Sequence, residues 1–573
     1  MKVIKKKINL KLMHFFLILL LVEEISNSKC GADKIKLNPI NLNSTNIHAK
    51  RDTASGYQPI KLGADFTSFR KPSRMSSDTF EKVKRLILET FDEFAKFIKI
   101  IHEDIDLSGE YNTIIRGCEV DEISSNYRNF LITNDVIVFP SFNSELGSSV
   151  LAAAGFCLTY GRTGRSRPIA GILLINPNLS FNIKNSEIYM KKLLLHEITH
   201  ILIFSPNLLK SLGMLEARNS NYYVTSPKAL LKARQHFNCA SITGIPLENQ
   251  GGEGSAGSHW ESRYMLGDYM ISTDYNDNVL SDITLALFED SGFYQVNYYT
   301  GGLFKFGKNK GCSFLNKKCI VDNKPISEEF CIQSEQPMCL ATRTYKGFCG
   351  IYDYSKYGYT IPSNYQYFDN PNLGGFAAAN YCPIAQYSDS DPRTDYYPDS
   401  CQIGTSTLHS DYGEKIGENS FCFVSSLLPT SSTQNSISQS ICYEVECNLS
   451  TKSIIVKVGQ TSVNCPTSGG DINIDGYKGS ITCPKFEEIC SFDNNVLCNE
   501  MFDCLNKKVE TASNSYEYDS NYEDFQIISE TDSNSYEYDP NDEDFQIVRV
   551  RSKSSNLKIN NFILLFLFFI YFF

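Results

Sequence analysis

At 573 residues the chain exceeds what one hydrophobic core usually supports, so its length predicts two or more domains. The net charge of −11 is local, because residues 510–548 contain twelve Asp and Glu and no Lys or Arg. Without that −12 the remainder sums to +1, so the acidic balance carries no information about a substrate. No basic stripe is present, which excludes nucleic acid as an expected partner.

The amino terminus has the three parts of a secretory signal peptide. Five lysines within residues 2–11 precede the apolar run 15–22, and Ser26 and Ser28 lie at −3 and −1 of a cleavage point. The apolar run is too short to span a bilayer comfortably, which disfavours a membrane anchor. We expect a signal peptide at 1–28 and an exported chain.

The polar segment 29–55 is propeptide-like, with Lys50-Arg51 as a candidate processing site. Nineteen cysteines in an exported chain predict disulfides, and the odd count leaves one over. Cys30 precedes the first periodic segment and is the predicted unpaired thiol, while the other eighteen could make nine pairs of undetermined connectivity.

A first helix is expected from about Asp78 to His102, because apolar residues recur at helical spacing. Asp78 and Glu81 resemble a capping box at its start. Two apolar runs, 136–139 and 172–175, read as strands, each ended by a proline (Pro140, Pro177).

A second helix is expected from about Ser186 to Phe204, and it carries the motif His196-Glu197-x-x-His200. Residues i and i+4 share one face of a helix, so both imidazoles can reach one cation. Zinc prefers such nitrogen ligands and leaves one position for water, from which Glu197 can take a proton. The alternative is that both histidines are ordinary residues of an apolar helix, but that would bury Glu197 at a cost.

Two histidines leave the site incomplete, and the next candidates along the chain are His236 and His259. His259 follows a glycine cluster at 251–257 and precedes Trp260-Glu261, with Met270 further on. From the residues alone, Met270 is simply a core residue.

The chain resembles the leishmanolysin-like (M8) surface metallopeptidases of the metzincin clan. The resemblance covers about residues 56–300 and thins beyond. It rests on these segments: 171–177, the motif helix with Phe204-Ser205, 236–248, 251–261, Met270 and 286–294.

The resemblance implies an α+β, metzincin-like catalytic domain at 56–300, with an insertion between the second and third zinc ligands. It implies one zinc ion per chain, His259 as third ligand, Met270 as Met-turn residue, and His236 as a structural residue. A propeptide cysteine holds members of the family latent, so Cys30 becomes a candidate latency thiol, although its flanking residues differ from the usual context.

The sequence departs from the family at Ile203, where a glycine with positive φ normally ends the motif helix. A β-branched residue is strained in that conformation, so we expect the chain to turn later, near Ser205-Pro206. Such a turn could displace His259 and weaken activity.

Fifteen cysteines fall between Cys312 and Cys504, which predicts a loop-rich, disulfide-stapled domain at 301–505. A twenty-residue repeat makes 506–551 an acidic, solvated stalk. Small residues, a polar spacer and the apolar tail 562–573 make 552–573 a predicted GPI-attachment signal, with a short protein anchor as the alternative.

Asn43, Asn178 and Asn448 lie in N-x-S/T triplets and are glycosylation candidates. The predicted function is a secreted or surface-anchored zinc endopeptidase that cleaves extracellular proteins, with Glu197 as general base. The alternative is a catalytically weakened adhesin or coat protein that keeps the fold, suggested by Ile203 and the acidic stalk.

Overall fold

The computed structural model describes residues 37–43, 49–51, 56–146, 150–161, 165–178, 186–219, 221–250, 256–273, 278–298, 303–387, 399–403, 410–448, 450–490, 492–493 and 496–497. They belong to one compact unit, Met1–Ser515. The predicted signal peptide, Cys30, the acidic repeat and the apolar tail lie outside the described residues. Within those residues, no helix has the length and apolar character needed to cross a membrane.

A five-stranded mixed sheet organises the amino-terminal half, in the order β1-β8-β9-β7-β4. Strand β8 pairs antiparallel with β9 and parallel with β1, whereas β9, β7 and β4 are mutually parallel. The bounds are β1 (Ile40–Asn43), β4 (Leu62–Ala64), β7 (Val136–Phe142), β8 (Ala152–Gly161) and β9 (Arg167–Ile175). The predicted propeptide-like segment thus contributes the edge strand β1.

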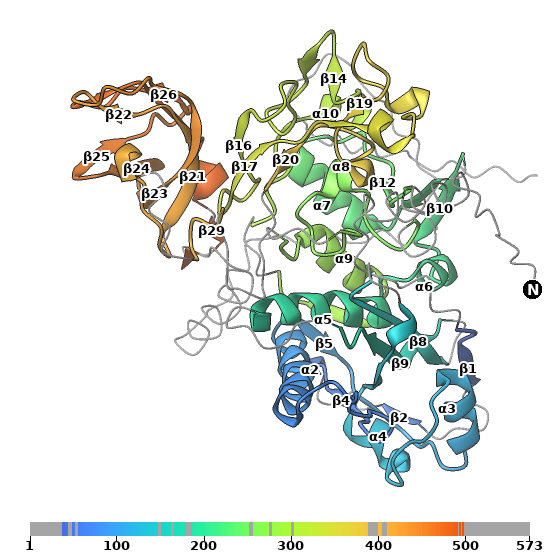
Figure 1. The fold of residues 1–573 in the computed structure, drawn as a ribbon. Helices are drawn as coiled ribbons and strands as arrows, with labels where there is room; N and C mark the ends of the chain where they lie inside the picture. Colours follow the sequence, from blue (N-terminus) through green and yellow to red (C-terminus); the bar gives the residue numbers. More distant parts are fainter. Residues whose placement is uncertain are drawn as a thin grey trace, which may run out of the picture. The chain divides into compact units, whose positions relative to one another are not determined.

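Helices cover both faces of this sheet, because its strands bury side chains alternately on either side. Val136 and Val138 pack with α2 (Ser77–Phe97) and α5 (Ser186–Leu202). Ile137 and Phe139 pack on the opposite face with α3 (Tyr111–Cys118) and α4 (Tyr127–Thr133). Figure 1 shows α5 running against β8 and β9 on the first of these faces.

The first helix begins and ends differently from the prediction. Ser76 is its N-cap, with a side chain that accepts from Thr79 N, so the expected Asp78–Glu81 capping pair is wrong. The helix stops at Phe97 rather than His102, because Ile98–Ile100 leaves as strand β5 and pairs with β3 (Gln58–Pro59) and β13 (Tyr294–Val296).

Strand β7 continues through Pro140, where the sequence predicted its end. Asp65 N donates to Val138 O at 3.0 Å, so Val138 faces the side of β4. The backbone nitrogen of Pro140, two residues further on, points to the same side but lies beyond the end of β4. No neighbouring strand needs a hydrogen bond from this position, so a residue without an N–H is tolerated. The second predicted strand ends at Ile175, before Pro177, as expected.

The segment after α5 forms small elements that share the main hydrophobic core with α5. Asp290 accepts from the backbone N–H groups of Lys228 and Ala229 and so caps α7. The elements are α6 (Pro206–Ser211), β10 (Leu215–Arg218), β11 (Asn221–Val224), α7 (Pro227–Phe237), β12 (Ile245–Pro246), α8 (Ser262–Met265), α9 (Asp282–Asp290) and α10 (Cys312–Asn316).

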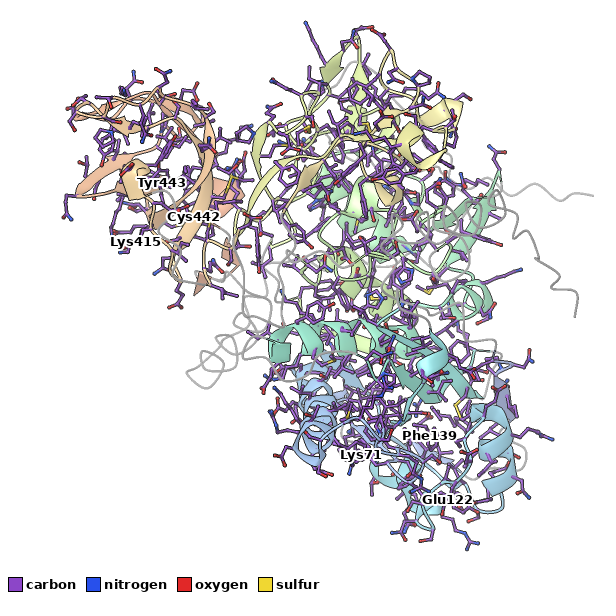
Figure 2. The ribbon with its side chains drawn as sticks, viewed as in Figure 1. Lys71, Glu122, Phe139, Lys415, Cys442 and Tyr443 are labelled. Atoms are coloured by element: carbon purple, nitrogen blue, oxygen red, sulfur yellow. A yellow bond between two sulfur atoms is a disulfide. The ribbon has the colours of Figure 1, made fainter. Side chains whose placement is uncertain are left out.

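The carboxyl-terminal half has more regular structure than the predicted loop-rich domain. It contains a six-stranded sheet in the order β25-β24-β23-β21-β28-β26. The bounds are β21 (Ser420–Ser425), β23 (Gln439–Asn448), β24 (Ser453–Val458), β25 (Thr461–Asn464), β26 (Gly470–Ile472) and β28 (Ile481–Cys483). In Figure 2, Cys442 and Tyr443 mark β23, where the Tyr443 hydroxyl lies 2.8 Å from Ser425 Oγ.

Short elements complete the described chain. They are β2 (Ala49–Arg51), β6 (Glu103–Ile105), β14 (Ile320–Val321), β15 (Lys324–Pro325), β16 (Pro337–Cys339), β17 (Lys346–Cys349), β18 (Tyr352–Asp353), β19 (Leu373–Gly374), β20 (Ala385–Gln386), β22 (Leu428–Pro429), β27 (Tyr477–Lys478), β29 (Phe492–Asp493), β30 (Val496–Leu497), α11 (Phe486–Ile489) and the 3-10 turns at 144–146, 354–357, 363–365, 377–379 and 410–412. Lys50-Arg51, the candidate processing site, lies in β2 and pairs with β6.

Disulfides join segments that are far apart in sequence. Those formed by described residues are Cys118–Cys157, Cys239–Cys312, Cys319–Cys382, Cys331–Cys349, Cys339–Cys422, Cys401–Cys442, Cys447–Cys490 and Cys465–Cys483. Cys498 and Cys504 lie outside the described residues. The main hydrophobic core runs from Ile60 to Ala385 and so crosses the predicted domain boundary at 300.

Candidate metal centre

Helix α5 carries His196, Glu197 and His200, and a glycine in the sheet lets it approach closely. A β-carbon at Gly171 of β9 would lie 2.5 Å from Cγ2 of Ile201. Atoms cannot approach that closely, so any larger residue would push α5 away from the sheet. The helix that bears the predicted motif is therefore fixed by close packing on β9.

His259 approaches from a segment beyond the insertion. Its carbonyl accepts from Glu248 N at 2.9 Å, and the next residue, Trp260, donates its N–H to Met270 O at 2.9 Å. His196 Nε2 lies 3.1 Å from His200 Nε2 and 3.2 Å from His259 Nε2. The three buried histidines form a cluster whose ligand atoms all lie within 4.8 Å of one another.

Hydrogen bonds at the other ring nitrogens fix how these histidines are protonated. His196 Nδ1 lies 2.6 Å from Tyr269 O, and His200 Nδ1 lies 2.7 Å from Phe204 O. A carbonyl oxygen only accepts, so each Nδ1 carries the hydrogen and each Nε2 is left with a bare lone pair. His259 Nδ1 lies 3.0 Å from Ser258 Oγ.

Burial keeps the two helix histidines neutral. It lowers the pKa of His196 to about 4, against the opposing effect of the bond to Tyr269 O. The pKa of His200 is also lowered well below its usual range, first by burial and then by the neighbouring His196 and His259. Neutral imidazole is the form that binds a metal ion.

The donor set fits one zinc ion. Bare lone pairs as close as those of His196 and His200 repel unless a cation lies between them. Two nitrogens bound tetrahedrally to zinc, each about 2.0–2.1 Å from the ion, lie about 3.3 Å apart. The distances from His196 Nε2 to the other two Nε2 atoms are close to that value. Glu197 follows His196 on α5 with a fully buried side chain.

The turn that contains Met270 lies directly behind His196. Met270 is fully buried, and its N–H donates to Asp268 Oδ1 at 2.7 Å. The preceding residue, Tyr269, contacts α5 twice: its carbonyl accepts from His196, and its hydroxyl lies 2.8 Å from Thr199 Oγ1. Sequence reasoning missed Tyr269 and Thr199, because nothing in their spacing reveals a contact that only the tertiary fold brings about.

The end of α5 avoids the strain that the sequence suggested. The described residues with positive φ do not include Ile203, whose N–H instead donates to Thr199 O at 2.9 Å. Phe204 N donates to the same carbonyl, and the extended Ser205 then begins α6. The chain therefore turns at Ser205-Pro206, as expected, and the three histidines remain together.

Two buried carboxyl groups, one before and one after His259 in the chain, accept hydrogen bonds from backbone N–H groups. Glu248 Oε1 accepts from the N–H groups of Asn249 and Gln250, and Glu261 Oε1 accepts from Arg263 N. Burial raises the pKa of Glu261 to about 8, and burial together with the nearby Glu261 raises that of Glu248 well above its usual range. No pattern in the sequence predicts a role for either residue.

The other predicted site residues lie away from this centre. His236 donates from Nε2 to Phe306 O at 2.9 Å and stacks on Phe304, and burial lowers its pKa to about 3. Asn43 is in β1, Asn178 is exposed after β9, and Asn448 ends β23. Glycosylation at these three positions stays a prediction, and Cys30 lies outside the described residues.

A helix that presents two histidines to a third from a distant segment defines a three-histidine metal centre of the metallopeptidase kind. The sequence model of the family described as leishmanolysin (Peptidase_M8) matches residues 118–496, more than half of the chain. The chain belongs to the leishmanolysin family of metallopeptidases, within the metzincin clan.

Curated proteins with names from the same family are similar to this chain in sequence. A "Leishmanolysin homolog" of Crithidia fasciculata is 29% identical over 360 residues, which are 60% of this chain and 53% of that protein. A "Leishmanolysin" of Leishmania tropica is 28% identical over 401 residues, 65% of this chain and 58% of that protein. A "Leishmanolysin-like peptidase" of Drosophila melanogaster is 29% identical over 310 residues, 47% and 44% respectively. The chain spans about half the length of the curated relatives it matches.

Proposed function

We propose that this chain is a zinc-dependent endopeptidase that hydrolyses peptide bonds of extracellular proteins, at the cell surface or after secretion. One observation carries the proposal: the Nε2 atoms of His196, His200 and His259 converge, and Glu197 lies beside the first of them on the same helix. Membership of the leishmanolysin family supports the same reading.

The chemistry follows from the residue types. A zinc ion held by His196, His200 and His259 would supply a Lewis acid for the scissile carbonyl and acidify the attacking water. Glu197 takes the proton of that water as general base and delivers it to the nitrogen of the departing amine. The bonds to Tyr269 O and Phe204 O keep the His196 and His200 rings oriented throughout.

The experiment compares two glutamates of α5. Glu197→Gln keeps size and polarity but removes the base, so kcat for casein cleavage should fall at least about 100-fold while bound zinc is unchanged. Glu187→Gln, at the exposed start of the same helix, is the control and should cleave normally. Cleavage that resists a chelator, or that survives Glu197→Gln, would overturn the proposal.

The alternative, a catalytically weakened adhesin or coat protein, was suggested by Ile203 and by the acidic stalk, which lies outside the described residues. Ile203 lies outside the left-handed region, so that observation no longer favours loss of activity. Export by a signal peptide, lipid anchoring of the mature chain and the latency role of Cys30 stay part of this proposal, since they depend on residues outside the described part of the chain.

A further inference from the structure

The turn behind His196 and the start of α9 meet at a carboxylate that the proposed reaction does not use. Asp268 is fully buried, and its Oδ1 accepts from Met270 N at 2.7 Å. Its Oδ2 accepts from Thr284 Oγ1 at 2.8 Å and from Ser281 N at 3.3 Å, both at the start of α9. The carboxylate therefore ties the turn behind His196 to a separate helix.

Each side of Asp268 leads to a different histidine of the cluster. On one side the adjacent residue, Tyr269, accepts from His196 Nδ1 through its carbonyl. On the other side Thr284 Oγ1 accepts from Trp260 Nε1 at 2.8 Å, and Trp260 directly follows His259. Two histidines that are far apart in sequence are thus connected through one carboxylate.

The direction of these bonds is fixed by chemistry. An ionised carboxylate only accepts, so the single Thr284 hydroxyl hydrogen must go to Asp268, which leaves the Thr284 oxygen to accept from Trp260. Burial raises the pKa of Asp268 to about 6, while bonds from Ser281, Met270 and Thr284 act in the opposite direction. These three donated bonds favour the ionised carboxylate, which can accept all of them.

We propose that Asp268 is a positioning residue that holds His196 and His259 at their mutual distance, through Tyr269 on one side and through Thr284 and Trp260 on the other. This inference rests on the proposed zinc site. Groups that orient metal ligands in this way commonly affect metal affinity by about 10- to 100-fold.

The test uses the full chain loaded with zinc and measures how fast a chelating dye removes the ion. Asp268→Asn has the same size, but each carboxylate oxygen of Asp268 accepts from a backbone N–H, of Met270 or of Ser281. In either orientation the amide NH₂ of the variant therefore faces an N–H group that cannot accept a hydrogen bond. Thr284→Val removes the hydroxyl that bonds both Asp268 and Trp260, and leaves the bond from Met270 N to Asp268 in place. Both should release zinc about 10-fold faster or more, with lower kcat and unchanged KM, whereas Thr284→Ser should restore the wild-type rate.

The control is Ser291→Ala at the other end of α9, which deletes a buried hydroxyl bonded to Phe288 O, off this path. Variants that lower the unfolding midpoint of the zinc-free protein but release zinc at the wild-type rate would overturn the inference and leave the proposed function standing. A wild-type chain that binds no zinc would overturn the proposed function, and this inference with it.

Discussion

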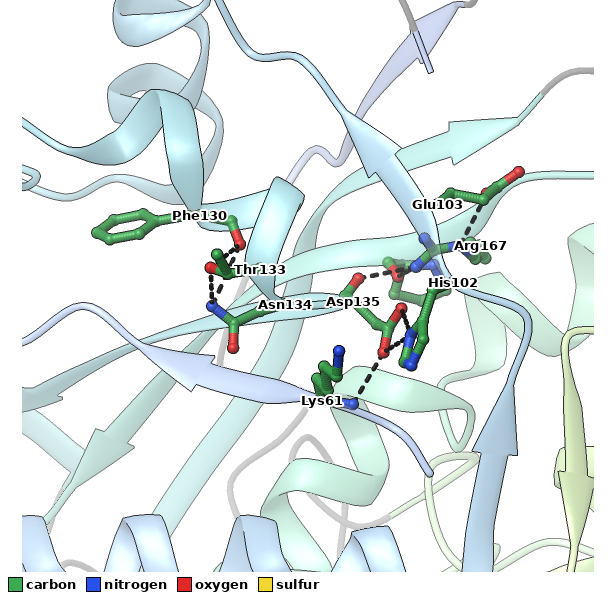
Figure 3. A network of polar contacts seen from close by, with 9 residues as sticks. Lys61, His102, Glu103, Phe130, Thr133, Asn134, Asp135 and Arg167 are labelled. Atoms are coloured by element: carbon green, nitrogen blue, oxygen red, sulfur yellow. Dashed lines mark hydrogen bonds and ion pairs between the residues drawn. The ribbon is translucent and has the colours of Figure 1, made fainter. Parts of the chain in front are cut away.

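Two buried polar centres in this molecule both contain histidine, and they differ in what each ring nitrogen contacts. In the metal centre, His196 and His200 donate from Nδ1 to backbone carbonyls. In the second centre, at the amino ends of β4, β7 and β9, His102 Nδ1 lies 2.8 and 2.9 Å from the two carboxylate oxygens of Asp135 (Figure 3).

The second centre is a network of hydrogen bonds around the buried carboxylate of Asp135. Asp135 also accepts from Lys61 N at 2.8 Å, and Arg167 donates to Asp135 O at 2.8 Å while reaching Glu103 (Figure 3). In this second centre, His102 serves as a hydrogen-bond partner of the buried Asp135 carboxylate. The carbonyl-bound histidines instead turn their unprotonated Nε2 atoms toward one another and toward the third histidine of the cluster, and this convergence distinguishes the candidate metal ligands from the structural His102.

Among the substitutions that test this difference between the two centres, the largest effect on stability is expected at Asp135. Asp135→Ala should lower the free energy of unfolding by about 3 kcal/mol, because it leaves His102 and Lys61 N without their buried acceptor. Zinc content should not change. Denaturant unfolding measures the loss, and Asp104→Ala, on the exposed face of β6, is the matched control. Loss of zinc from Asp135→Ala would erase the distinction between the two centres.

A smaller effect is expected at the hydroxyl of Tyr269. Tyr269→Phe removes its bond to Thr199 but keeps the carbonyl that holds His196, and Thr199 still donates to Leu195 O. Stability should fall by about 1 kcal/mol, again by denaturant unfolding. Tyr294→Phe is the comparison, since that buried hydroxyl makes only a 3.4 Å bond to Leu202 O and should matter less. An equal loss in both would show that the Thr199 bond contributes nothing specific.

Helical periodicity predicted two of the three histidines and the glutamate of the metal centre. His196 and His200 lie one turn apart on a strongly apolar helix, and Glu197 directly follows His196. His259 required the family resemblance, since no local rule relates residues on either side of a long insertion. Tyr269 and Asp268 were out of reach: their roles depend on contacts with α5 and α9 that only the tertiary fold creates.

Where the sequence-based predictions for the rest of the fold were wrong, the causes are local. Ser76 caps the first helix because its side-chain oxygen accepts from Thr79 N. A serine at this position is as good a start signal as Asp78, so the sequence did not distinguish the two caps. Strand β7 passes Pro140 because its neighbour β4 has already ended. The carboxyl-terminal sheet was missed because a high density of cysteines predicts loops, although β24 (Ser453–Val458) contains a run of β-branched residues of the kind that favours strands.

The most direct test of the central claim is the zinc content of the purified, desalted chain, with His259→Ala and His236→Ala beside it. The account predicts one zinc per wild-type chain, one in His236→Ala, whose ring donates to Phe306 O, and almost none in His259→Ala. A wild-type chain without zinc, or a His259→Ala chain that keeps it, would contradict the account.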